Sequence, residues 1–116
     1  MTGQLAVMVG TNLHVSFSHP VSQDEFHDYA ARLMDELLAL EECDNSITDS
    51  TVSSDADERL FTVEIVVRTD DQFEASEKAF ATLRAALHAA GAGTPGWPTV
   101  VRTEGRTGPL EDLMSA

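Results

Sequence analysis

The order of its regular segments predicts that this chain folds as an α+β sandwich. Apolar residues alternating with polar ones mark four strands, and apolar residues recurring every three or four positions mark two helices. The segments are Leu13–Phe17, Gln23–Glu42, Ile47–Val52, Leu60–Thr69, Gln72–Ala90 and Trp97–Thr103. Strand, helix, strand, strand, helix, strand is the order of the ferredoxin-like βαββαβ fold, an antiparallel sheet with two helices on one face.

The first helix carries the clearest signals for its start and its buried face. Ser22 and Glu25 have the spacing of a capping box, and Val21 can pack against Phe26 as a hydrophobic staple. One face is apolar, and it consists of Phe26, Tyr29, Ala30, Leu33, Leu37 and Leu40. The opposite face carries an acidic stripe of four carboxylates, which are Asp24, Asp28, Asp35 and Glu42.

Alternation assigns the two faces of the sheet. In the strand Leu60–Thr69, one set of side chains faces the helices, namely Phe61, Val63, Ile65 and Val67, and the other set is Thr62, Glu64, Val66 and Arg68. The strand Leu13–Phe17 alternates in the same way. Five polar residues are therefore expected on the open face as a candidate surface for a ligand or a second copy: His14, Ser16, Thr62, Glu64 and Arg68, with Thr99 or Val101 beside them.

The second helix follows a cap at Asp70 or Asp71. Its buried stripe is predicted to be Phe73, Ser76, Phe80, Leu83, Leu87 and Ala90. Gly91 ends the helix, and Pro95 prevents its continuation.

One domain is expected over residues 13–104. Residues 1–12 form an N-terminal extension or an extra strand, in which Leu5–Val9 either stands alone or joins the next strand through a bulge near Gly10. Residues 105–116 are expected to be a flexible tail. A length of 116 residues suits one domain of this kind.

Composition narrows the setting and the partners. A lone cysteine, Cys43, and the absence of a signal-peptide pattern or a long apolar run point to a cytoplasmic protein that does not enter a membrane. The net charge is −13, and residues 22–58 hold twelve acidic residues against one basic residue, Arg32. Direct nucleic-acid binding is disfavoured because it needs many basic side chains, whereas a basic protein partner suits this charge.

Patterns typical of catalysis or cofactor binding are not found. The histidines lack the spacing of a metal site, and Cys43 lies among acidic neighbours that disfavour a thiolate. The glycines at 91–96 follow a helix, whereas a phosphate-binding loop follows a strand and opens a helix. We therefore expect no enzyme activity, no metal site and no cofactor, and a half-buried structural role for Cys43.

Two short segments carry a resemblance. The run Ala85-Ala86-Leu87-His88-Ala89-Ala90-Gly91, followed by Thr94-Pro95-Gly96-Trp97, resembles small acidic α+β proteins of actinobacteria and their phages. The similarity spans roughly residues 13–98. It implies an intracellular bacterial or phage setting and a ferredoxin-like fold, and no activity comes with it.

Two kinds of function remain open. The first is a non-enzymatic interaction or regulatory module that presents the acidic stripe to a protein partner, with a DNA-mimic inhibitor as its sharpest form. The second is a regulatory domain that binds a small molecule and forms a homodimer through its sheet.

Overall fold

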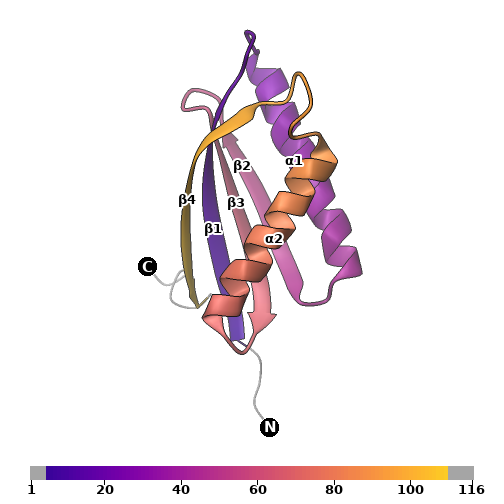
Figure 1. Ribbon diagram of the computed structural model, residues 1–116, viewed down its shortest axis with the longest axis vertical. Helices are drawn as coiled ribbons and strands as arrows, with labels where there is room; N and C mark the ends of the chain where they lie inside the picture. Colours follow the sequence, from indigo (N-terminus) through magenta and orange to yellow (C-terminus); the bar gives the residue numbers. More distant parts are fainter. Residues whose placement is uncertain (1–4, 110–116) are drawn as a thin grey trace.

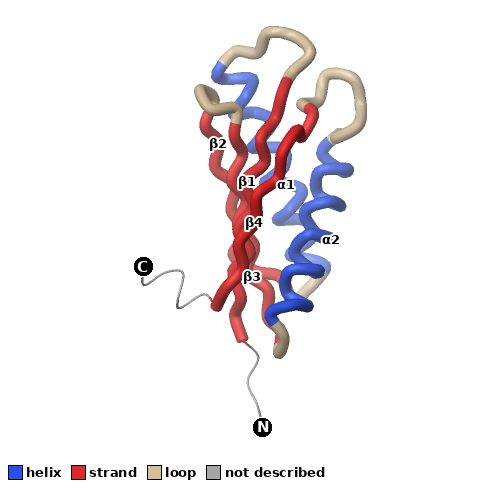
Figure 2. The backbone as a smooth tube through the Cα atoms, turned by 60° about the vertical axis from the view of Figure 1, so that its left-hand side comes forward, coloured by secondary structure: helices blue, strands red, loops and turns tan. Residues whose placement is uncertain are grey.

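The computed structural model describes residues 5–109 and confirms the ferredoxin-like fold (Figure 1). The elements are β1 (Leu5–Ser16), α1 (Gln23–Cys43), β2 (Ile47–Asp55), β3 (Leu60–Thr69), α2 (Gln72–Ala90) and β4 (Thr99–Pro109). The strands form one antiparallel sheet in the order β2-β3-β1-β4. Both helices cover the same side of this sheet, and the other side is bare of helices (Figure 2).

The core lies between the sheet and the helices, as alternation predicts. Strand β3 contributes Phe61, Val63, Ile65 and Val67, and β1 contributes Val7, Val9, Leu13 and Val15, all of them buried. Val66 faces the opposite side, yet it is only 3% exposed, beside Met8 of β1 and Thr48 of β2. One end of the open face is therefore apolar.

Helix α1 has the predicted start and the predicted buried face. The Ser22 hydroxyl accepts from the Glu25 N–H, and the Glu25 carboxylate accepts from the Ser22 N–H, which completes the capping box. Buried residues on α1 are Phe26, Ala30, Leu33 and Leu37, with Tyr29 and Leu40 at the margins.

Helix α2 is rotated relative to the predicted stripe. Its buried residues are Ala75, Ala79, Thr82, Leu83 and Ala86, whereas Phe73 is 70% exposed and Phe80 is 37% exposed. Alanine lets the helix approach the sheet closely, and a row of alanines contacts the sheet where phenylalanines were expected. The larger side chains are displaced to the flank of α2.

The first and last strands are longer than predicted. Strand β1 begins at Leu5 and runs through Gly10 without a break in its pairing with β3, and β4 continues beyond Thr103 to Pro109. The boundaries drawn at residues 13 and 104 therefore cut through two strands. The rest of the expected extension and tail, residues 1–4 and 110–116, lies outside the described residues.

The two helices are tied together where α1 ends. Asp44 is the C-cap residue of α1, and its carboxylate forms an ion pair with Lys78 of α2. The hydrogen bond from Lys78, followed by those from Ser46, lowers the pKa of Asp44 to about 2. A carboxyl group with a depressed folded-state pKa stabilises the fold above its ordinary pKa of 3.8, and the stabilisation disappears as the pH falls toward 2.

We predict that Asp44→Asn lowers the free energy of unfolding by about 1 kcal/mol at pH 7, a value discounted because the pair is partly exposed to solvent. The difference should be much smaller near pH 2, because about half of the wild-type carboxyl groups are then protonated. Urea unfolding at both pH values measures the difference. Asp57→Asn, at an exposed turn position, is the matched control, and a loss that did not depend on pH would contradict the prediction.

Candidate functional site

The register of the strands arranges the open face in rows. One row crosses the sheet through Glu64 of β3, Gly10 of β1 and Arg106 of β4. The next row is Thr62, Asn12 and Glu104, and the third is Leu60, His14 and Arg102. The centre of the open face is therefore polar and charged.

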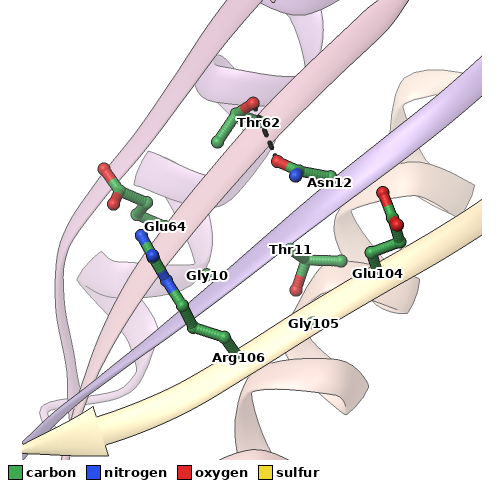
Figure 3. A pocket seen from close by; sticks show the side chains of 8 residues that line it. All are labelled: Gly10, Thr11, Asn12, Thr62, Glu64, Glu104, Gly105 and Arg106. Carbon is green, nitrogen blue, oxygen red and sulfur yellow. Dashed lines mark hydrogen bonds between the residues drawn. The ribbon is translucent and has the colours of Figure 1, made fainter.

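A groove of about 280 Å³ lies over the first two rows (Figure 3). Its lining comes from the three strands β1, β3 and β4, and consists of Gly10, Thr11, Asn12, Thr62, Glu64, Glu104, Gly105 and Arg106. The Thr62 hydroxyl donates to the Asn12 side-chain oxygen at 3.0 Å, and the Thr51 hydroxyl donates to the Glu64 carboxylate at 3.3 Å. These bonds orient the polar side chains that line the groove on the β3 side.

An arginine lies over Gly10 at the middle of this groove. The Nε atom of Arg106 lies 4.0 Å from the position that a Cβ on Gly10 would occupy. The Arg106 side chain therefore reaches across β1 toward the side of the groove that holds Glu64 (Figure 3). The groove thus carries a carboxylate from β3 and a guanidinium from β4.

A second charged cluster lies on the third row and its neighbour. The His14 Nε2 and a Glu104 carboxylate oxygen are 2.7 Å apart, and Arg102 Nη2 lies 3.1 Å from that nitrogen and 3.7 Å from the Glu104 oxygen. His14 Nε2 cannot both donate to Glu104 and accept from Arg102. We assign it as the donor to Glu104, because that contact is the shorter one and a carboxylate can only accept. The bond from His14, and next the charge of Arg102, lower the pKa of Glu104.

The candidate residues on the open face are brought together only in part. Thr62 and Glu64 line the groove, and His14 reaches it through Glu104. Ser16 is exposed at the end of β1 opposite Thr99, away from the groove. Arg68 lies four residues beyond Glu64, about 13 Å along the strand, and lines a separate depression with Glu74, Glu77 and Lys78.

Sequence reasoning missed six of the eight residues that line the groove. Glu104, Gly105 and Arg106 were assigned to the end of the domain and the tail, and Gly10, Thr11 and Asn12 to an N-terminal extension or extra strand. The charged alternation of Arg102, Glu104 and Arg106, every second residue, was the signal that could have identified β4 as a strand with a polar face.

The acidic stripe lies on the exposed surface of α1. Asp24, Asp28, Asp35 and Glu42 are all exposed, and on an ideal helix they fall within an arc of about 40° along about 27 Å. Between residues 5 and 109, the ion pairs are those of Asp44 with Lys78 and of Glu104 with His14 and Arg102. None of them involves the stripe, so its charges do not hold this part of the fold together.

The described residues show no group of three or more side chains suited to a metal ion. Cys43 is exposed, which corrects the expectation of a half-buried structural cysteine. It is the last residue of α1, so its side chain lies beyond the buried face of the helix. Neither α1 nor α2 has the length and apolar character needed to cross a membrane.

Comparison with known proteins establishes the fold and nothing finer. The chain matches no protein-family model, and no curated protein is significantly similar to it in sequence. Among solved structures it resembles a dimeric ferredoxin-like protein of unknown function from Thermobifida fusca, with a TM-score of 0.53 and 18% sequence identity, over 95% of this chain and 96% of the other. The resemblance to actinobacterial and phage proteins stays a prediction.

We predict that His14→Leu, which removes the donor, raises the pKa of Glu104 toward its ordinary value, because the hydrogen bond from His14 is the largest cause of the depression. NMR titration of the Glu104 side-chain carboxyl carbon in the wild type and the variant measures this directly. The same titration of Glu58, an exposed carboxylate outside the cluster, serves as an internal control. A Glu104 that titrated identically in both proteins would show that the contact does not exist in solution.

Proposed function

We propose that the protein is a non-enzymatic interaction module that presents the acidic stripe of α1 to a basic protein partner. The observation that supports this most is that four carboxylates share one exposed row and make no ion pair among residues 5–109. Repulsion between like charges three or four residues apart weakens an isolated helix slightly. A row of this kind is therefore explained by solubility or by a partner.

An exposed leucine in the same row favours a partner over solubility alone. Leu38 is 44% exposed and lies three residues after Asp35 and four before Glu42, so its side chain is a neighbour of both carboxylates on the helix surface. An apolar anchor surrounded by charges is the usual composition of a protein-binding surface.

The partner suited to this row is a basic helix or extended segment that can follow it for about 27 Å. Charge attraction would speed its association and would weaken as salt rises. A protein that mimics DNA toward a nucleic-acid-binding protein is the sharpest form of this proposal, and the overall charge of −13 supports it.

We predict that replacing the stripe, as Asp24→Asn, Asp28→Asn, Asp35→Asn and Glu42→Gln together, abolishes capture of basic proteins from a bacterial lysate at low salt. The wild-type capture should itself be lost at high salt, because the attraction is electrostatic. Affinity capture followed by mass spectrometry measures both.

A matched control removes the same amount of charge elsewhere, as Asp49→Asn, Asp57→Asn, Glu58→Gln and Asp70→Asn, all at exposed positions outside α1. This control should retain the captured proteins. If both quadruple variants lost them equally, the capture would reflect net charge alone, and the stripe would have no specific role.

A second candidate function is favoured by the groove on the open face. There, a carboxylate and a guanidinium flank the gap above Gly10, and Asn12 and Thr62 supply neutral polar groups. A small zwitterion, with a carboxylate for Arg106 and an ammonium group for Glu64, has the matching chemistry. The protein would then be a regulatory domain that binds a small molecule and forms a homodimer through its sheet.

We predict that at least one free amino acid, from a panel of the twenty, raises the thermal midpoint of the wild type, since a ligand of the native state stabilises it. The rise should be absent in Arg106→Gln, which keeps polarity and removes the charge. His27→Gln, a similar change on α1 away from the groove, should respond as the wild type does. A flat response of the wild type to the whole panel would exclude this ligand class.

A further inference from the structure

We infer that the outer edge of β4 is a self-association surface, on which β4 of a second copy pairs antiparallel about a two-fold axis at Gly105. The sheet would then continue through both protomers as eight strands. This inference deepens the self-association part of the second candidate function, and it does not depend on the acidic stripe or on the groove ligand.

The first argument is the state of the two sheet edges. Strands β2 and β4 are the outer strands, and between residues 5 and 109 neither has a partner on its outer side. The edge of β2 is interrupted, because its pairing shifts between Thr48 and Thr51 and Asp49 has a φ of 52°. Strand β4 pairs regularly with β1 from Arg102 to Pro109. A long regular edge is a template for another strand, and an irregular one discourages pairing.

The second argument is charge complementarity between two copies of β4. A two-fold axis at Gly105 sets Glu104 opposite Arg106 of the second copy, and Arg106 opposite Glu104 of the second copy. In one protomer Glu104 contacts His14 and Arg106 lies over Gly10, so both side chains turn outward when this pair forms. Thr103 then faces Thr107 of the second copy. Opposite charges directly across an antiparallel pair are stabilising, and like charges are destabilising.

Other registers serve less well. An axis at Glu104 would oppose Glu104 to itself and Arg102 to Arg106. An axis at Thr103 also opposes unlike charges, Arg102 to Glu104. It would, however, run the pairing into the irregular part of β4, where its register against β1 shifts between His14 and Val15. Of these three axes, only the one at Gly105 both sets opposite charges across from each other and keeps the pairing within the regular segment of β4.

The third argument is the apolar flank of α2. Phe73, Phe80 and Leu87 are spaced by seven residues and therefore form one row beside the alanines that face the sheet. Leu87 is partly buried against the core, and the two phenylalanines are exposed. Phe73 is 70% exposed and Phe80 is 37% exposed. Exposed phenylalanines in a row at one edge of a sheet mark an interaction surface.

This row lies over β4 at the position that the axis requires. The Phe80 ring is 3.3 Å from the position that a Cβ on Gly105 would occupy, and the Ser76 hydroxyl lies 2.8 Å from that of Thr107. Ser76 lies beside Thr107 and Phe80 beside Gly105, so residue numbers rise along α2 where they fall along β4. The helix therefore runs antiparallel to the strand. An axis at Gly105 therefore brings the two Phe80 rings close together and sets Phe73 of each protomer toward Leu87 of the other.

The oligomeric mass of purified protein, measured by sedimentation equilibrium over a range of concentrations, tests the inference without any ligand or basic partner. The wild type should be a dimer. Phe73→Glu should raise the dissociation constant of the dimer at least about tenfold, because it removes apolar contact between the protomers. Arg106→Glu should do the same, because it sets a glutamate opposite Glu104 of the second copy. The double variant Glu104→Arg with Arg106→Glu restores opposed charges and should return the constant to within about threefold of the wild-type value.

Two further controls keep the result interpretable. Phe73 is largely exposed, so its variant should keep the wild-type circular dichroism spectrum and thermal midpoint at concentrations where both are monomers. Thr62→Arg places a large charge at the middle of the open face; it should leave an edge dimer intact and break a dimer that pairs face to face. The inference is overturned by a monomeric wild type, or by a dimer that survives both Phe73→Glu and Arg106→Glu.

Discussion

The pairing of β1 with both of its neighbours is the constraint on which the rest of this structure depends. Strand β1 pairs with β3 over Leu5–His14 and with β4 over Val7–Ser16, and β3 in turn pairs with β2. Because side chains alternate across a strand, this register decides which residues meet on each face. It buries Val7, Val9 and Leu13 under the helices and sets Gly10 between Glu64 and Arg106. A shift of the β1 register by one residue would turn its core side chains to the open face and its open-face side chains to the core.

Close packing of α2 is the second determinant, and it connects the helix to the edge of the sheet. Alanines at positions 75, 79 and 86 let α2 lie near the sheet. The aromatic row is thereby moved sideways until Phe80 covers Gly105. A larger residue at 105 would collide with that ring unless the ring shifted. The glycine of β4 and the alanines of α2 therefore serve the same contact, and together they leave Phe73 exposed beside β4, whose outer side has no partner among residues 5–109.

The same contacts explain what the sequence could and could not predict. Strand β3 and helix α1 carry apolar residues at regular spacing, so their extent and buried faces were predicted closely. The part of β4 beyond Thr103 was not predicted, because its inward positions are Thr103, Gly105 and Thr107, which carry no large apolar side chain. Phe80 of α2 lies over Gly105. The predicted buried face of α2 was the aromatic row, because hydrophobic periodicity favours large apolar side chains. It does not show that a face of alanines can pack closer to the sheet. Only the β3 side of the groove was predicted, because the rest of its lining comes from β4 and from the part of β1 before Leu13.

The acidic stripe of α1 and the outer edge of β4 lie on different parts of the molecule, so a partner on one does not block the other. Helix α1 packs over β2, at the end of the sheet opposite β4, and its stripe faces outward. Pairing of two β4 edges would place the α1 helices at the far ends of an eight-stranded sheet, so a dimer would expose two acidic stripes. Two linked sites raise the avidity for a partner that can reach both, with no new contact at either. Self-association through β4 would thus strengthen what α1 binds while leaving α1 itself unchanged.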